Sequence, residues 1–278
     1  MTEFVTSADG TAIAFDRTGE GPPIILVGGA TQFRAFDATT IELAHQLAAR
    51  DFTAVNYDRR GRGESTDTPP FAIEREIEDI DALVAGVGGS AALYGSSSGA
   101  ALCLWAAATG VAVTKLVLWE PPLSLPGEGD DGAWLAGLAQ RVAAGDHESA
   151  AEFFMRDMPP EWLETARTSD AWQTMLDIAP TLVYDAAVLE RAQHGPWNEL
   201  WATVTMPTLV IVGEQTLPNF PPVAEALVAA LPNAAERRID AANHDWEPGV
   251  MADAIAGFLR GGFPHETASH PEGPERAG

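Results

Sequence analysis

The sequence predicts an α/β fold built on a mostly parallel sheet flanked by helices. Two observations support this class. Strand-like apolar runs alternate with helix-like segments over most of the 278 residues, as is typical of parallel strands joined by crossover helices. A Gly-x-Ser-x-Gly turn at 95–99 also lies between a short apolar run and a helix-forming run, so strand, sharp turn and helix follow one another there.

Short runs of aliphatic, β-branched and aromatic residues predict the strands of this sheet, eight in all. They lie at 4–6, 11–15, 24–27, 53–57, 91–94, 116–119, 208–212 and 236–240. The first two flank Asp9-Gly10, which is a hairpin signal. Helical patterns occupy 41–47, 74–84, 100–108, 223–231 and 250–259.

Residues 123–203 interrupt the alternation and are far too many for an ordinary connection between strand and helix. We expect a helical cap there, inserted after the sixth strand, so that the core domain comprises 1–122 and 204–260. Residues 261–278 are polar and rich in Gly, Pro, Glu and His, which predicts a disordered tail. The cap is rich in aromatic residues and Met, namely Trp134, Phe153, Phe154, Met155, Trp162, Trp172, Met175, Tyr184, Trp197 and Trp201.

The composition bounds the classes of partner. The net charge of −24, from 40 acidic and 16 basic residues, repels nucleic acid and anionic membranes. The chain has no apolar run of the ~18 residues that a membrane span requires, and it does not open on a signal-peptide pattern. Its single cysteine, Cys103, excludes an internal disulfide and is expected to pack in the core. We therefore expect a cytoplasmic protein that binds neither nucleic acid nor membrane.

Ser97, at the centre of the turn, is the predicted nucleophile. Gly95 and Gly99 lack the Cβ atoms that would collide where the strand and the helix pass close together. The hydroxyl would stand clear of the sheet, and the amides at the start of the helix favour negative charge. Ser96 and Ser98 are poorer candidates, because a shift by one residue rotates the hydroxyl away from the apex of the turn.

From residue 3 to about residue 260, the order of these features resembles the α/β-hydrolase fold, which has this turn. The resemblance implies a histidine base on the loop after the last strand, and His244 stands there. The remaining histidines fall on an expected surface helix, in the cap or in the tail, and are expected to be solvated: His45, His147, His194, His265 and His270.

The resemblance leaves alternatives for the acid that would orient the base. Most of the family has an Asp shortly after the strand at 208–212, but Thr216 stands at that place here, and Glu214 is the nearby carboxylate. Glu120 follows the strand at 116–119 instead, a placement similar to that in zearalenone-lactonase-type members. We favour Glu120, because its strand is expected to adjoin that of Ser97; Asp245, adjacent to His244, is a weaker third candidate.

The same resemblance implies an oxyanion hole of two backbone N–H groups. One would come from Ser98 and the other from Ala30, with Gly29 as the alternative to Ala30. Phe33 and Phe36, just beyond, are expected to add to an apolar pocket. Residues 58–65 resemble the family's D-x-x-G-x-G-x-S loop and are interpreted as structural support for the site wall.

No motif indicates a cofactor or a metal. The arginines of 58–65 lack the GK[ST] spacing of a phosphate-binding loop, and no G-x-G-x-x-G opens a helix after the first strand of a βαβ unit. Neither an H-E-x-x-H motif nor a Cys/His cluster is present.

The sequence thus predicts a cofactor-free serine hydrolase that cleaves a carboxylic ester or lactone of a mostly apolar small molecule. Ser97, His244 and Glu120 would be catalytic, and Phe33, Phe36, Trp134 and Phe154 would bind substrate. Alternatives within the fold are a thioesterase, a C–C bond hydrolase and a biosynthetic cyclase. A different class is a small-molecule receptor without turnover, although the complete set of predicted catalytic residues favours an enzyme.

Overall fold

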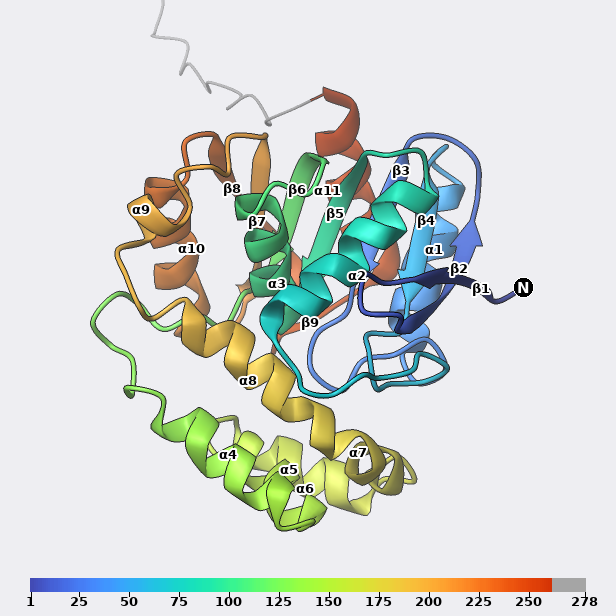
Figure 1. The fold of residues 1–278 in the computed structure, drawn as a ribbon. Helices are drawn as coiled ribbons and strands as arrows, with labels where there is room; N and C mark the ends of the chain where they lie inside the picture. Colours follow the sequence, from blue (N-terminus) through green and yellow to red (C-terminus); the bar gives the residue numbers. More distant parts are fainter. Residues whose placement is uncertain (262–278) are drawn as a thin grey trace, which may run out of the picture.

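A computed structural model describes residues 1–261 of the chain (Figure 1). A single nine-stranded sheet has the order β1-β2-β4-β3-β5-β6-β7-β8-β9. The strands are β1 Glu3–Thr6, β2 Ala12–Thr18, β3 Pro23–Val27, β4 Thr53–Tyr57, β5 Ala91–Ser96, β6 Val113–Trp119, β7 Thr208–Gln215, β8 Ala234–Ala242 and β9 Asp245–Trp246. The central strands from β4 to β8 pair in parallel, whereas β1, β2 and β9 run antiparallel to their neighbours. The prediction of a mostly parallel sheet is confirmed.

The strand count differs from the eight that the sequence pattern predicts. The additional strand is β9, where Ala241 pairs with Trp246 and Ala242 pairs with Asp245. Its two residues are too few to show the alternation by which a strand is recognised. The chain therefore turns back sharply at Asn243–His244 instead of leaving the sheet in an open loop.

Helices cover both faces of the sheet and form a three-layer structure (Figure 1). Helices α2 Ile73–Gly86, α3 Ser98–Ala108 and α10 Phe220–Ala230 pack on one face with one hydrophobic cluster. Helices α1 Ala38–Ala48 and α11 Pro248–Gly261 pack on the other face with a second cluster. Each face is apolar because strands with helices on both sides are buried on both sides.

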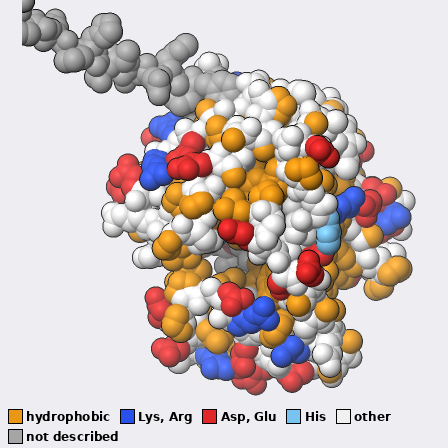
Figure 2. Space-filling model, turned by 90° about the vertical axis from the view of Figure 1, so that its left-hand side faces the viewer, with side chains coloured by type: hydrophobic (Ala, Val, Ile, Leu, Met, Phe, Trp, Pro, Cys, Tyr) orange, Lys and Arg blue, Asp and Glu red, His pale blue; other side chains and the backbone are white. Residues whose placement is uncertain are grey.

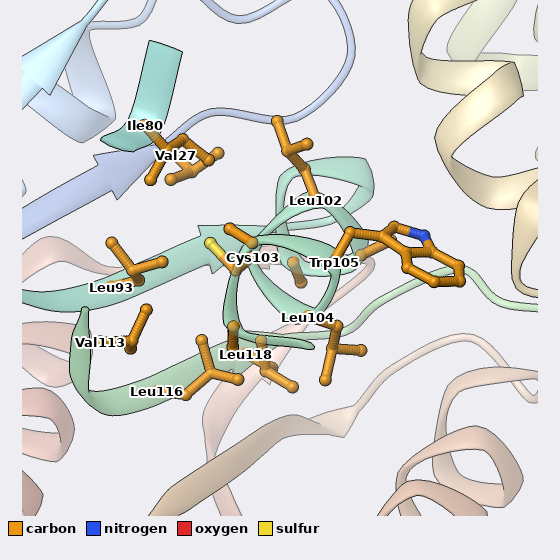
Figure 3. Packing of buried hydrophobic residues seen from close by; sticks show 14 of the residues in the cluster. Val27, Ile80, Leu93, Leu102, Cys103, Leu104, Trp105, Val113, Leu116 and Leu118 are labelled. Carbon is orange, nitrogen blue, oxygen red and sulfur yellow. The ribbon is translucent and has the colours of Figure 1, made fainter. Parts of the chain in front are cut away.

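Helix α3 lies at the centre of the larger cluster. It is apolar on all sides, and its residues from Ser98 to Ala107 are buried, as expected for a helix enclosed by other elements. Figure 3 shows Cys103 among the apolar side chains of β5 and β6, with Leu93, Leu116 and Leu118 nearby. Cys103 is fully buried and burial raises the pKa of its thiol, so it is a core residue rather than a second nucleophile.

A helical segment connects β6 to β7 and lies beyond one end of the sheet (Figure 1). It comprises α4 Ala133–Ala143, α5 His147–Phe154, α6 Pro160–Thr168, α7 Trp172–Ile178, the 3₁₀ turn η1 Ala179–Thr181, α8 Leu182–Arg191 and α9 Trp197–Leu200. It has its own small core, which includes Leu138, Phe154 and Leu182. Helix α8 attaches it to the sheet body, since the indole Nε1 of Trp105 in α3 donates to the carbonyl of Val188 at 3.2 Å.

The last described helix, α11, ends at Gly261, the first residue of the predicted tail. The rest of that prediction, residues 262–278, lies outside the described part of the chain, as do His265 and His270. Within residues 1–261, none of the helices has the length and apolar character that a bilayer crossing requires.

Figure 2 shows acidic side chains scattered over one face of the molecule and apolar side chains near its centre.

Candidate active site

The predicted catalytic residues and the predicted donor Ala30 follow strands of the parallel sheet at their carboxyl ends. Ala30 follows β3, Ser97 follows β5, Glu120 follows β6 and His244 follows β8. Because parallel strands end at the same edge of a sheet, residues far apart in the sequence meet there. The helical segment that follows β6 lies beyond this edge.

Ser97 occupies a strained turn between β5 and α3. Its backbone angles are φ 56° and ψ −123°, a region that non-glycine residues rarely adopt. A Cβ atom added at Gly99 would lie 2.3 Å from the carbonyl oxygen of Val27, and one at Gly95 would lie 2.5 Å from Cα of Ala100. The turn can form because both positions are glycine, as the motif predicts.

His244 and Glu120 are in direct contact. Nδ1 of the imidazole lies 2.6 Å from Oε2 of Glu120, whose other oxygen accepts the backbone N–H of Gly213 at 2.9 Å. A carboxylate only accepts hydrogen bonds, so this contact requires the proton on Nδ1, and in a neutral imidazole Nε2 is then the acceptor. Glu120 is almost completely buried, which holds this pair in one geometry.

Aromatic rings fix the plane of the His244 imidazole. The ring of Phe220 stacks on it at a centroid distance of 4.6 Å and an interplanar angle of 7°. Trp119, the last residue of β6, lies 6.1 Å away with an interplanar angle of 18°. The imidazole is therefore held both by a hydrogen bond and by packing, while its side chain remains 18% exposed.

The two other candidate acids lie apart from this contact. Glu214 is exposed near the end of β7. The carboxylate of Asp245 accepts the backbone N–H of Trp246 at 2.9 Å. Within residues 1–261, Glu120 is the carboxylate to which the His244 ring is hydrogen-bonded.

The loop after β3 lies against the turn of Ser97. A Cβ atom at Gly29 would lie 2.8 Å from the carbonyl oxygen of Ser96, so the close approach requires glycine. The N–H of Gly29 already donates to Oε1 of Gln32 at 2.5 Å. Of the two predicted donors on this loop, the geometry thus favours Ala30 over Gly29 for an incoming ligand.

Two cavities meet beside Ser97. We name each after a residue that lines that cavity and not the other. The Met175 cavity has a volume of about 300 Å³ and the Trp134 cavity about 430 Å³. Six residues line both: Ala30, Ser97, Phe154, Met158, Trp162 and His244. The candidate nucleophile and base therefore face the same space, and Ser98 joins them in the wall of the Trp134 cavity.

The predicted substrate-binding residues divide into two pairs. Phe154 lines both cavities and Trp134 lines the Trp134 cavity; their rings are tilted by 36° with centroids 5.2 Å apart. Phe33 and Phe36 are absent from the walls of both cavities and stack on each other instead, with centroids 5.4 Å apart. Their loop closes into a tight turn, in which the N–H of Phe36 donates to the carbonyl of Phe33 at 2.9 Å.

Several other aromatic residues and methionines of the helical segment fall into two groups, of which one lines a cavity and the other is buried in a core. Met155, Trp162 and Met175 line the Met175 cavity, and Met158 is a cavity residue that the sequence pattern did not single out. Trp197 and Trp201 are buried in the core of the sheet body. Sequence gives no signal that separates these groups, since both consist of large apolar side chains.

The arginines of 58–65 are buried rather than available to phosphate. Arg59 forms a paired contact with the carboxylate of Glu76, at 2.7 Å from both nitrogens. Arg60 forms the same kind of contact with Asp79, at 2.7 and 2.8 Å. These contacts agree with the interpretation of the loop as internal support.

Among residues 1–261, no group of three or more His, Cys, Asp and Glu side chains could hold a metal ion.

The comparison with protein families decides the family. The model of the alpha/beta hydrolase family matches residues 24–258. The chain belongs to this family. Membership in the alpha/beta hydrolase family supports a hydrolase.

Solved structures resemble this alpha/beta hydrolase over nearly its whole length. An alpha/beta hydrolase from Sphaerobacter thermophilus DSM 20745 is 37% identical, with a TM-score of 0.83 over 92% of this chain and 100% of the other. A thermophilic esterase from Thermogutta terrifontis is 25% identical, with a TM-score of 0.68 over 94% and 97%. The enol-lactonase from Burkholderia xenovorans LB400 shares the fold at 18% identity, with a TM-score of 0.66 over 93% and 98%. Among curated proteins, no sequence matches this chain.

Proposed function

We propose that this protein is a serine hydrolase that cleaves a carboxylic ester or lactone of a mostly apolar small molecule through an acyl-enzyme. The observation that carries the proposal is the 2.6 Å contact between His244 and Glu120 beside the strained turn of Ser97. A serine hydroxyl is a weak nucleophile and requires an oriented base. The Glu120–His244 pair provides one on the wall of the cavities that Ser97 also lines.

The proposed reaction proceeds in two stages. Ser97 Oγ attacks the substrate carbonyl while Nε2 of His244 takes the hydroxyl proton. The tetrahedral oxyanion accepts hydrogen bonds from the N–H groups of Ala30 and Ser98, and Glu120 stabilises the imidazolium. His244 then protonates the leaving alcohol oxygen, and a water molecule activated by His244 hydrolyses the acyl-enzyme.

The Met175 cavity favours an apolar part on one side of the scissile bond, whereas the Trp134 cavity, whose wall also carries Glu128, Asp130, Arg156 and Asp157, favours a part with both apolar and polar groups. Methionines and aromatic rings of the helical segment line the Met175 cavity, and Leu189, Leu217 and Phe220 contribute to the Trp134 cavity. Asp37 and Asp245 border the first cavity, which disfavours an anionic group there. The esterase and the enol-lactonase of the same fold support an ester or lactone as the bond cleaved.

Covalent labelling with a fluorophosphonate tests this mechanism, because the reagent phosphonylates a serine only when that serine is activated. We expect one label per chain, located at Ser97 by peptide mass spectrometry, and turnover of p-nitrophenyl esters. Ser97→Ala should abolish both. Ser90→Ala, an exposed serine just before β5, should retain both.

Two outcomes would contradict the proposal. Full turnover in folded Ser97→Ala would exclude Ser97 as the nucleophile. Failure of the wild-type protein to label or to turn over any ester, together with tight binding of an apolar ligand, would favour a receptor.

A further inference from the structure

Asp185 is a fully buried carboxylate in the helical segment, on α8, and it contacts the sheet body directly. Its Oδ1 accepts a hydrogen bond from the hydroxyl of Ser98 at 2.7 Å and another from Nη1 of Arg59 at 2.5 Å. Its Oδ2 accepts Nη2 of Arg62. One side chain from the helical segment is thus bound to the start of α3 and to two residues of the 58–65 loop.

This contact reaches both proposed oxyanion donors: it binds the side chain of Ser98, and through Arg62 it reaches the Gly29–Ala30 peptide group. Ser98 supplies one proposed donor through its own backbone N–H. Arg62, held by Asp185, donates from Nη1 to the carbonyl oxygen of Gly29 at 2.8 Å. The carbonyl of Gly29 and the N–H of Ala30 belong to one planar peptide group. Fixing that carbonyl therefore fixes the direction in which the Ala30 N–H points.

The contact also bears on the strength of the Ala30 donor. A hydrogen bond from a charged guanidinium to a carbonyl polarises the peptide, and chains of hydrogen bonds strengthen one another in a dry interior. The Ala30 N–H is thereby a stronger donor to developing negative charge. Arg62 is buried, so water does not weaken this effect.

The charges of the cluster balance. Arg59 and Arg62 face Asp185 and Glu76, and all four side chains are buried. Burial by itself raises the pKa of Asp185, but the two guanidinium groups outweigh it, so the pKa lies below its ordinary value. Asp185 is therefore ionised at neutral pH, and it can hold both arginines and the Ser98 hydroxyl at once.

We propose that Asp185 is a positioning residue that aligns both oxyanion donors, Ser98 directly and Ala30 through Arg62. The inference rests on the proposed serine-hydrolase function. It assigns a catalytic contribution to the helical segment beyond lining the cavities, because the segment supplies the carboxylate that organises the hole.

The test compares Asp185→Asn with Asp79→Asn. Asp79 is a matched control, because it is also a buried carboxylate bound to an arginine of the same loop, Arg60, and it contacts neither Ser98 nor the Gly29–Ala30 peptide. The readouts are kcat and KM for a p-nitrophenyl ester, and the affinity for an aryl trifluoromethyl ketone. That ketone adds to the nucleophilic serine as a hemiketal oxyanion, so its affinity reports on the hole.

We expect Asp185→Asn to lower kcat by about 10- to 100-fold, since loss of one complete oxyanion donor costs about 100- to 1,000-fold. KM should change by less than about 3-fold, and affinity for the ketone should fall by a factor similar to that in kcat. Asp79→Asn should lose thermal stability and yet retain kcat and ketone affinity.

A second variant keeps the test decisive if Asp185→Asn does not fold. Ser98→Ala removes one hydroxyl hydrogen bond to Asp185 and leaves the backbone N–H in place. It should lower kcat and ketone affinity together by about 3- to 10-fold. Wild-type kcat and ketone affinity in Ser98→Ala, or in folded Asp185→Asn, would overturn the proposal. Absence of fluorophosphonate labelling in the wild-type protein would instead refute the serine-hydrolase function itself.

Discussion

At the scale of single residues, the proposed catalytic side chains share an unusual backbone. Ser97, Glu120 and His244 have φ values of 56°, 38° and 65°. Non-glycine residues in such conformations cost about 1–3 kcal/mol each and persist only where surrounding contacts impose them. Two of those contacts are hydrogen bonds across strands, from Ser97 N–H to the Trp119 carbonyl at 2.9 Å and from Glu120 N–H to the Ile211 carbonyl at 3.2 Å.

The choice of acid yields a prediction at this scale. Glu120→Gln should lower kcat by roughly 10³- to 10⁴-fold, because an amide in place of the carboxylate can impose the wrong imidazole tautomer and cannot stabilise the imidazolium. Glu214→Gln, at an exposed position, should leave kcat within about 2-fold of wild type. Steady-state kinetics on folded variants checks both, and the opposite ranking would reassign the acid to Glu214.

At the scale of elements, the site depends on how closely α3 approaches the neighbouring strands. The start of α3 lies so close to the end of β3 that no Cβ atom fits at Gly99. A Cβ atom there would lie 2.3 Å from the carbonyl oxygen of Val27 and 2.6 Å from that of Gly28. The Trp105–Val188 hydrogen bond, at 3.2 Å, attaches α8 to the same helix. The position of α3 thus determines how the proposed nucleophile, the loop after β3 and the helical segment lie relative to one another.

This packing predicts opposite effects for two glycine substitutions. Gly99→Ala should destabilise the protein by more than about 2 kcal/mol, since backbone oxygens have no room to move. Gly257→Ala, on the exposed side of α11 with its nearest neighbour at 3.9 Å, should stabilise the protein by about 0.5–1 kcal/mol through helix propensity. Urea unfolding measures both, and equal effects would show that the close approach at Gly99 is not limiting.

At the scale of the whole molecule, the net charge of −24 is the dominant electrostatic feature. Self-repulsion of this size opposes the compact state and repels anionic ligands. The ion pairs of Arg59, Arg60 and Arg62 are buried, and salt screens such pairs far less than it screens exposed charges. The surface and the interior therefore respond differently to ionic strength.

The melting temperature should accordingly rise with salt. Between about 20 mM and 500 mM NaCl at pH 7, the Debye length falls from roughly 20 Å to 4 Å, which screens the surface repulsion and leaves the buried pairs intact. Scanning calorimetry at several salt concentrations checks this. A melting temperature that falls as NaCl is added would show that exposed ion pairs outweigh the repulsion.

Most of the architecture follows from local patterns. Apolar runs, helical spacing and the Gly-x-Ser-x-Gly turn depend on neighbouring residues, so the parallel sheet and the turn of Ser97 could be predicted from the chain alone. The adjacency of β5 and β6, on which the preference for Glu120 depends, is confirmed. The two-residue β9 was missed because it is too short to have a period.

Contacts between distant side chains required the folded chain. The 2.6 Å contact of Glu120 with His244 spans 124 positions, and the 2.7 Å contact of Ser98 with Asp185 spans 87. Nothing near Asp185 distinguishes it from the other carboxylates of the helical segment, and nothing near Phe33 shows that its ring packs on Phe36 instead of a cavity. Such pairings depend on how whole helices and strands pack. The packing energy is spread over many core residues, so no single sequence position indicates the pairing.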